Sequence, residues 1–270
     1  MSLLLEQTRE ARIVERRKRL RADKISSVVM PVIGVCGLFV IWQSFIVVND
    51  VPAWQLTPPL NVFKSMIFSF KEVYAAHVVR TFLSILVGWS CACVIGVAMA
   101  ALMCNYPILN SMLTPYINFL CTLPVITLVP MMYVFMGVGQ NVIIIAVIMQ
   151  SFAIVCMNSS TGFLNVPIIR KEMMISLRAS KSQILFQCNL PSALSNVFTG
   201  MKLSAIFATT TCVSAEVNGS AVGLGALVIT AKAYSRTEQM CGAIIYIALI
   251  GVFFYMLTDI FEAVFIKWKD

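Results

Sequence analysis

Long uncharged apolar runs, separated by short polar or charged segments, make up most of the chain. No Asp, Glu, Lys or Arg occurs from Thr81 to Ile169, a stretch long enough for three bilayer crossings at about 20 residues each. Helices marked by uncharged length, and ended at proline, glycine and polar clusters, give six transmembrane helices. The predicted spans are about 27–48, 79–103, 112–136, 140–162, 192–214 and 239–262. The pattern therefore predicts an all-α membrane protein.

A shorter helical pattern lies between the first two predicted spans. Pro58 and Pro59 are suited to begin it, since proline is tolerated in the first turn of a helix. Apolar residues then recur at helical spacing, at Leu60, Phe63, Ile67 and Phe70. This spacing predicts a helix lying on the outer membrane interface. An ordered external loop is the alternative.

The composition agrees with a membrane protein. Hydrophobic residues make up 59% and charged residues 12% of the chain, whereas a soluble domain carries about 25% charged residues. This excludes an ordinary soluble enzyme, and also a disordered chain, which would be poor in apolar residues. The nine cysteines are scattered without a C-x-x-C pair, so we interpret them as small buried hydrophobic residues. His77 is the single histidine, which excludes a multi-histidine metal site.

The basic residues predict how the chain crosses the membrane. Eight of the 20 Lys and Arg lie in residues 1–24, and the uncharged run that follows is too long for a signal peptide and ends at no small-residue cleavage site. We therefore expect a basic arm over 1–24 and a six-span domain over 25–270. The arm, the loop 164–190 and the tail carry fourteen basic residues against four on the opposite side. The positive-inside rule then places both termini in the cytoplasm.

Sequence motifs for catalysis are missing. No glycine is followed by lysine, so the chain lacks a P-loop, and it contains neither H-E-x-x-H nor G-x-S-x-G. We expect no catalytic, cofactor-binding or metal-binding residue, which weighs against an intramembrane enzyme. A stand-alone channel or secondary transporter remains an alternative. It is weakened because only Lys202 lies near the centre of a span, whereas ion-coupled transporters usually carry ionisable residues there.

The most informative segment is the predicted cytoplasmic loop at about 164–191. Glu172 to Leu177 predicts a short amphipathic helix, Ala179 to Ser182 a polar turn, and Ile184 to Leu190 a second apolar stretch ended by Pro191. A helix that exposes Met173, Met174 and Leu177 to the cytosol needs a protein partner.

This loop resembles that of the transmembrane permease subunits of ABC importers. Their loop reads E-A-A, three residues, G, nine residues, then I-x-L-P. The chain matches it at Glu172, at Ala179 and Ser180 after the glycine position, and at Leu190 and Pro191. The resemblance continues in three further elements. They are Gly200, Met201, Lys202 and Leu203 for G-L-[RK]-L; Ala215, Glu216, Gly223, Leu224 and Gly225 for the A-E-x6-G-L-G stretch of the nitrate/sulfonate/taurine branch; and Pro58, Pro59, Leu60 and Val62 for its P-x-P-x-x-V element.

Two departures from the family pattern lie in the loop. Met173 and Met174 replace the two alanines, and Arg178 replaces the glycine. Glycine permits a positive φ that arginine adopts only at a cost. Either the turn is rebuilt here or the docking geometry differs from that of the family. Methionine is an adaptable interface residue, so docking is compatible with its presence.

The resemblance implies a type I importer fold in a bacterial inner membrane. It implies three partners: a separate ATP-binding subunit in which the loop docks, a second permease copy, expected to form a homodimer, and an external substrate-binding protein. The chain itself would bind no cofactor, because ATP belongs to the partner subunit. We also expect contact with membrane lipid and none with nucleic acid. The family branch carries small anions such as nitrate, taurine and alkanesulfonates, and also vitamin precursors such as pyrimidines.

Polar residues inside the predicted spans have two interpretations. A lysine at the bilayer centre costs roughly 2.5–3.5 kcal/mol unless it faces protein or water, so Lys202 either lines a path or gate, or pairs internally to hold helices together. Glu216 either pairs with Lys232 or Arg236 or shapes an outer gate. Several hydroxyl and amide residues either line a path between two subunits or bond within the helix bundle. They are Gln150, Asn158, Ser159, Ser160, Thr209, Thr210 and Thr211.

Overall fold

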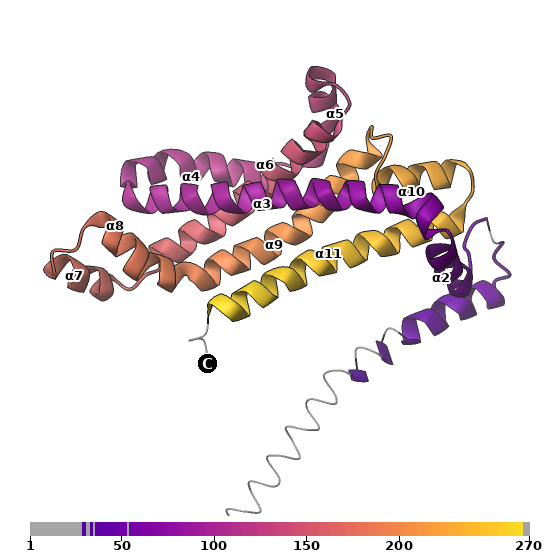
Figure 1. The fold of residues 1–270 in the computed structure, drawn as a ribbon, viewed down its shortest axis with the longest axis horizontal. Helices are drawn as coiled ribbons and strands as arrows, with labels where there is room; N and C mark the ends of the chain where they lie inside the picture. The colour runs from indigo at the N-terminus through magenta and orange to yellow at the C-terminus, as the bar shows by residue number, and fades with distance from the viewer. Residues whose placement is uncertain (1–28, 31–32, 35, 53, 267–270) are drawn as a thin grey trace, which may run out of the picture. The chain divides into compact units, whose positions relative to one another are not determined.

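The computed structural model describes residues 29–30, 33–34, 36–52 and 54–266, and this part of the chain is almost entirely helical (Figure 1). It divides into two compact units, residues 1–63 and 64–270, and each is described by itself. The basic arm predicted over 1–24 lies outside the described residues.

The first unit contains an apolar helix over Cys36–Val48. Within the first predicted span, about 27–48, the described residues 29–30, 33–34 and 36–48 are all helical. Further along, α2 runs over Pro59–Phe68, and the division between the units falls within it. The carbonyl of Pro58 accepts hydrogen bonds from the N–H groups of Asn61 and Val62 at 3.0 and 3.3 Å. The helix predicted to begin at these prolines is thereby confirmed, while its place on the membrane interface stays a prediction.

The second unit holds the long apolar helices. Its elements are η1 (Phe70–Tyr74, a π-helix), α3 (Ala75–Asn105), α4 (Pro107–Thr122), α5 (Val125–Met136), α6 (Gln140–Leu164), α7 (Ile168–Ser176), α8 (Lys181–Ile184), η2 (Leu185–Asn189, a π-helix), α9 (Leu190–Val217), α10 (Leu224–Ala233) and α11 (Thr237–Phe265). Four continuous segments are long and apolar enough to cross a membrane: Phe70–Asn105, Gln140–Leu164, Lys181–Val217 and Thr237–Phe265. They contain the second, fourth, fifth and sixth predicted spans.

The third predicted span, about 112–136, is wrong as a single helix. The chain forms α4 and α5 there, bent by 94° at Leu123 and Pro124. Proline lacks the N–H that would continue α4, and it pushes the preceding residue out of the helical region. Leu123 accordingly has φ −67° and ψ 124°. The apolar run from α4 to α5 is therefore two helices joined at a sharp bend, either a broken span or a re-entrant loop.

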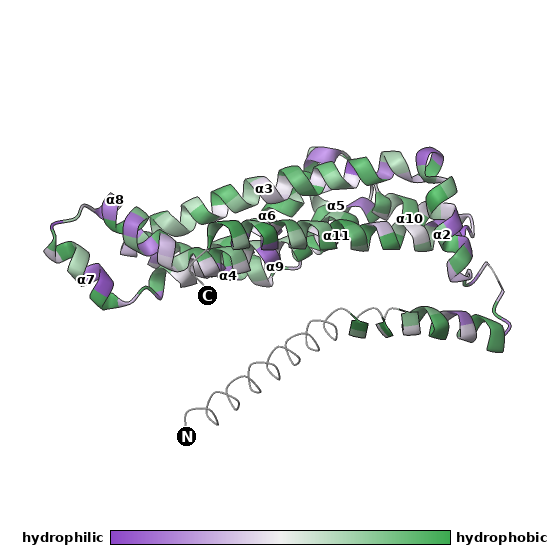
Figure 2. Ribbon diagram, turned by 60° about the horizontal axis from the view of Figure 1, so that its bottom comes forward, coloured by the Kyte–Doolittle hydropathy of each residue, from purple (hydrophilic) through white to green (hydrophobic). Residues whose placement is uncertain are grey.

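Helix α6 lies at the centre of the second unit, between α3 and α9. Two glycines of α3 let α3 and α6 approach closely, as small residues do between membrane helices. A Cβ added at Gly88 would lie 2.7 Å from Cγ1 of Val147, and one added at Gly96 would lie 3.0 Å from Cβ of Val155. Helix α11 covers α9 and α10. Figure 2 shows these long helices as predominantly hydrophobic.

The two ends of the second unit carry different structures. The α7–α8 pair projects at one end of the long helices, and α10 lies at the other (Figures 1 and 2). Between the fifth and sixth predicted spans, at 192–214 and 239–262, the chain forms α10. Candidate functional residues occur at both ends and between them.

Candidate functional site

Helix α7 presents large apolar side chains that the described residues leave exposed. None of its residues is buried. Met173, Ile175 and Leu177 are 58%, 61% and 72% exposed, and Met174 is half-buried. Large exposed apolar side chains gathered on one short helix are typical of a protein-docking surface. We call residues 168–180 the docking loop.

The turn after α7 keeps the backbone geometry of a glycine turn although arginine occupies it. Arg178 has φ 57°. Its N–H donates to the carbonyl of Ile175 at 2.8 Å, and the N–H of Ala179 donates to the carbonyl of Met174 at 3.0 Å. This is the Schellman pairing that closes helices at a left-handed residue. Arg178 itself therefore occupies the left-handed position at this helix end, and its effect on docking stays a prediction.

The next helix begins with a capping box at Ser180. The N–H of Gln183 donates to Oγ of Ser180 at 3.3 Å, while the N–H of Ser180 donates to Oε1 of Gln183 at 2.8 Å. Both bonds satisfy N–H groups at a helix start. Ala179 and Ser180 thus shape the loop, because they set where α8 begins.

The prediction that Pro191 ends the second apolar stretch is wrong. Helix α8 continues through η2 into α9 as one span, with Pro191 in the first turn of α9. The preceding π-turn brings the N–H of Leu190 to the carbonyl of Leu185, and a proline in a first helical turn costs no ordinary helix bond. Leu190 and Pro191 are half-buried in the bundle, whereas Glu172 is exposed in α7.

Polar contacts hold the docking loop to the bundle at its base. Nη1 of Arg170 donates to Oγ of Ser192 at 3.2 Å, and Nζ of Lys171 donates to the carbonyl of Phe163 at 3.4 Å. On the α8 side, Nζ of Lys181 lies 5.6 Å from the centre of the Tyr106 ring. These contacts fix the loop at its start and end while the apolar side chains of α7 stay exposed.

At the opposite end, Glu216 ties three helices together. It is 1% exposed. Its Oε1 accepts from Oγ1 of Thr81 at 2.7 Å, and its Oε2 accepts from the N–H of Gly225 at 2.9 Å. Oγ1 of Thr81 in turn accepts from the N–H of Leu224 at 2.9 Å. Glu216 of α9 therefore anchors α3 and caps the first turn of α10, where a helix favours negative charge.

Gly223 is required beside this carboxyl group. It has φ 151°, and a Cβ added there would lie 2.3 Å from Cδ of Glu216. Its N–H and carbonyl lie 3.0 and 2.8 Å from Nδ1 of His77. The A-E-x6-G-L-G stretch thus joins α3, α9 and α10 through hydrogen bonds and close packing. The partners Thr81 and His77 were not identified from the sequence, because they lie more than 130 residues from the stretch.

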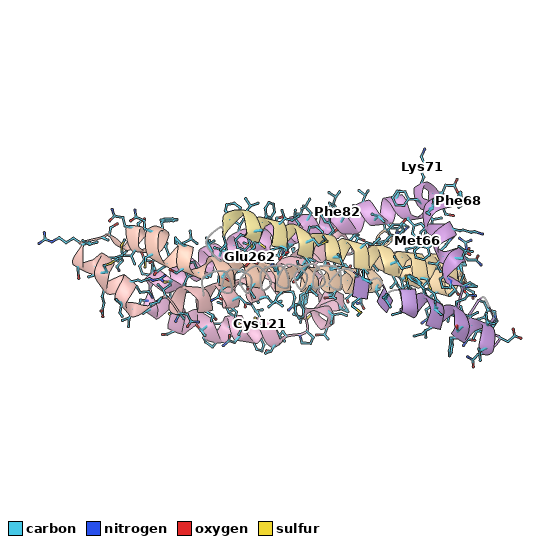
Figure 3. The ribbon with its side chains drawn as sticks, turned by 90° about the horizontal axis from the view of Figure 1, so that it is seen from below. Met66, Phe68, Lys71, Phe82, Cys121 and Glu262 are labelled. Atoms are coloured by element: carbon cyan, nitrogen blue, oxygen red, sulfur yellow. The ribbon has the colours of Figure 1, made fainter. Side chains whose placement is uncertain are left out.

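Lys202 pairs with two carboxylates of α11. Its Nζ contacts Oδ1 of Asp259 and lies 2.6 Å from Oε2 of Glu262. The side chains of Lys202 and Glu262 are 17% and 12% exposed, and Figure 3 labels Glu262 on α11. The lysine thus holds α9 to α11, in the manner of the internal-pairing interpretation.

The other two path candidates differ in where they lie. Asn158 donates from Nδ2 to the carbonyl of Ile154 in its own helix at 2.9 Å. Its Cβ would lie 2.7 Å from a Cβ added at Gly200, so it packs in the α6–α9 contact. Thr210 is exposed and lies beside the break between α4 and α5. Of the described residues, no group of three His, Cys, Asp or Glu could hold a metal ion.

Comparisons with known proteins give one consistent result. A family model described as "Binding-protein-dependent transport system inner membrane component" matches residues 92–269. The bicarbonate transport system permease protein CmpB of Synechococcus elongatus is 25% identical over 259 residues, which cover 91% of each chain. The taurine transport system permease protein TauC of Escherichia coli is 24% identical over 257 residues, 93% of this chain and 92% of the relative. The MetNI methionine ABC transporter, solved in an inward-facing conformation, matches with a TM-score of 0.65 at 17% identity over 74% of this chain and 99% of that chain. This last likeness shows a shared fold.

Proposed function

The chain belongs to the family of binding-protein-dependent transport system inner membrane components, and we propose that it forms the path for a small anion in an ATP-driven importer. Members of this family are the membrane-spanning permease subunits of ABC importers. They are not catalytic: ATP hydrolysis takes place in a separate ATP-binding subunit, and a substrate-binding protein delivers the solute. The proposal adds the solute class, the orientation and the residues that act.

The solute class is supported by the relatives. CmpB is named for bicarbonate, a small monovalent anion, and TauC for taurine, a small zwitterion whose anionic group is a sulfonate. A vitamin or pyrimidine precursor is the second solute class that the family resemblance implies. The net charge of +8 does not distinguish these classes, because eight of the basic residues lie in the first 24 positions.

The orientation follows from the distribution of basic residues. We place both termini and the docking loop in the cytoplasm, and the α10 end outside, in a bacterial inner membrane. The chain would bind no cofactor of its own, and lipid would cover the exposed apolar faces of the long helices that no subunit covers.

The docking loop is the contact with the ATP-binding subunit in this proposal. Its exposed side chains Met173, Ile175 and Leu177 would enter an apolar groove of that subunit, with Glu172 at their edge. Arg178, Ala179 and Ser180 act by setting the turn, and Met174 by packing beneath it. Leu190 and Pro191 act indirectly, since they join the loop to the long helix α9 without a break. Movement of the loop would therefore be transmitted along α9.

The solute path would lie between two copies of the chain. Among the four path candidates, Thr210 lines a cavity, whereas Lys202, Glu216 and Asn158 are engaged in contacts between helices. We assign Thr210 to the path and the other three to holding the helices that move. ATP binding would close the partner subunits and shift the permease pair between outward-open and inward-open states, each favoured by the ligands that bind it more tightly.

The exposed apolar surface of α7 is the observation that carries the docking proposal, and partner capture tests it. The tagged chain is purified from its native host in mild detergent, and stoichiometric partners are identified by mass spectrometry. We expect a P-loop ATPase with the wild type, and at least about tenfold less of it with Leu177→Glu, because a charge at the centre of an interface removes a major contact. Glu172→Ala should weaken capture less.

Val222→Glu is the matched control. It places the same charge on an exposed apolar residue, 39% exposed, at the opposite end of the second unit, and should leave capture unchanged. Equal capture by wild type and Leu177→Glu would refute docking through α7. No ATPase in several detergents, together with solute movement by the chain alone in liposomes, would favour the secondary transporter or channel instead.

A further inference from the structure

A cavity of about 300 Å³ lies at the break between α4 and α5. The end of α4 and the start of α5 form one wall, and α6 and α9 form the others. At about 30 Å³ per water molecule, the cavity has room for about ten waters, or for a small solute that keeps part of its hydration shell. Its lining includes Cys121 of α4, Gln150 of α6, and Thr211 and Ser214 of α9.

Two polar side chains of this lining are buried and have no hydrogen-bond partner among the described residues. Gln150 and Thr211 are each 7% exposed, and both border the cavity. The polar atoms of both side chains nevertheless stay accessible from the cavity, because neither residue contributes to the fully buried, unbonded side-chain atoms of the described residues. Thr209, two residues before Thr211, differs in this respect, because its hydroxyl donates to the carbonyl of Ala205 at 3.1 Å. The cavity therefore offers free polar groups in an apolar setting.

These groups are arranged to donate hydrogen bonds. Ser214 follows Thr211 by three residues, so both hydroxyls lie on the same face of α9. Gln150 adds amide N–H groups from α6. Helix α5 begins at the wall of the cavity without a side-chain cap, and the N-terminus of a helix carries unpaired N–H groups and a partial positive charge. Broken membrane helices direct such ends at anionic solutes.

The charge of the lining limits what the cavity can hold. Its residues include no Lys, Arg, Asp or Glu within the described part of the chain. A carboxylate would repel an anion, and a lysine or arginine would bind it tightly. Neutral donors around a helix N-terminus favour a single negative charge and release it readily, as a transport path requires. A divalent anion would lose too much hydration without a counter-charge.

We propose that this cavity is a transient site for a small monovalent oxyanion, held by Gln150, Thr211 and Ser214 at the N-terminus of α5. The assignment rests on the proposed function and deepens it, because it places the solute at one point of the path. It also accounts for the break in the third span, which creates both the cavity and the helix end.

Cys121 provides a probe of this site, since its thiol belongs to the lining and Figure 3 labels it on α4. The purified chain, with any subunits that copurify with it, is placed in liposomes and treated with two methanethiosulfonates of similar size. One bears a sulfonate and the other a trimethylammonium group. The rate of modification at Cys121 is measured by peptide mass spectrometry. Each rate is divided by that of the same reagent with a small free thiol.

We expect the corrected rate of the anionic reagent to exceed that of the cationic reagent by about fivefold or more, from the favourable charge at a helix N-terminus. Sodium nitrate should slow the anionic reagent more than sodium chloride of equal concentration. Thr211→Val and Gln150→Leu should bring the ratio close to one. Thr209→Val, the matched control, should keep it. Ser214→Ala provides a smaller change that leaves the packing intact.

An equal or faster rate for the cationic reagent would overturn the proposal, as would an unchanged ratio in Thr211→Val, Gln150→Leu and Ser214→Ala. Equal loss in Thr209→Val would also overturn it, because the effect would then not depend on groups in the cavity. The ratio reports on this chain whether or not an ATPase is captured. Failure of this site and failure of the proposed function are therefore distinguishable.

Discussion

Glu216 provides the sharpest test of how the chain holds its helices together. Its carboxyl group accepts hydrogen bonds from Thr81 at 2.7 Å and from the N–H of Gly225 at 2.9 Å, and it is almost fully buried. Glu216→Ala removes both acceptors and leaves both donors in an apolar interior. A hydrogen bond to a charged group contributes about 1.5–3 kcal/mol, so the loss should be about 3–5 kcal/mol.

The expected loss is measurable by thermal unfolding in detergent, followed by intrinsic fluorescence. A change of 1 kcal/mol shifts Tm by about 2–4 °C in a chain of this size, so Glu216→Ala should melt roughly 6–20 °C below the wild type. Glu216→Gln keeps the shape but turns its amide N–H₂ toward one of the two donors. We therefore expect about half of that shift.

Glu238→Gln is the control for loss of charge alone, because Glu238 is exposed in the first turn of α11. Its Tm should stay within about 2 °C of the wild type, as expected for a surface substitution. The reasoning would be refuted if Glu216→Ala melted with the wild type, or if Glu238→Gln lowered Tm as much as Glu216→Ala.

Three further pairs of variants test other contacts by the same melting assay or by partner capture. Gly88→Ala should destabilise the chain by about 1–3 kcal/mol, because the added carbon would lie 2.7 Å from a side-chain carbon of α6. Gly251→Ala should be neutral, because its added carbon would lie 3.6 Å from the nearest atom. Equal Tm values for the two variants would contradict the close contact between α3 and α6. Lys202→Met removes the cation between two carboxylates of α11 and should lower the free energy of unfolding by about 3–5 kcal/mol. Asp259→Asn, at a side chain 63% exposed, should lower it by less than about 1 kcal/mol. The reverse order would contradict the role of the lysine in holding α9 to α11. Arg178→Gly should preserve ATPase capture. Arg178→Val should reduce capture, because a β-branched residue is strongly disfavoured at φ 57°. Full capture with valine would mean that docking does not depend on this turn.

The apolar pattern predicted the long helices because each signal is local. An uncharged run of span length forms a helix whatever its neighbours are, as in α3, α6 and α11. The break at Leu123 and Pro124 was missed because the run stays uncharged through it and other prolines of the run, Pro115 and Pro130, lie inside helices. The restriction on the residue before proline does signal the break. The prediction that Pro191 ends a helical stretch was wrong because a proline interrupts a helix only where the helix needs the missing N–H. The first turn of α9, where Pro191 lies, does not need it.

The candidate site residues also fall into two groups, those whose roles the sequence predicts and those whose roles depend on the tertiary structure. A short amphipathic helix was predictable at 172–177 because its apolar and polar residues follow one another in sequence, although α7 begins four residues earlier, at Ile168. The roles of Lys202 and Glu216 were not, because their partners lie 57 and 135 residues away. The unpartnered state of Gln150 and Thr211 also depends on tertiary structure, since nothing local distinguishes Thr211 from Thr209.

The central claim is that an ATP-binding subunit acts through the docking loop on a path inside this chain. The direct measurement is the modification rate of Cys121 in the captured complex, without nucleotide and with ATP and vanadate, which trap the closed state of ABC ATPases. The account predicts a severalfold difference between the two states, and no difference when Leu177→Glu permease is mixed with the same ATPase and nucleotide. The same rate in both states of the wild-type complex, while that complex hydrolyses ATP, would contradict it.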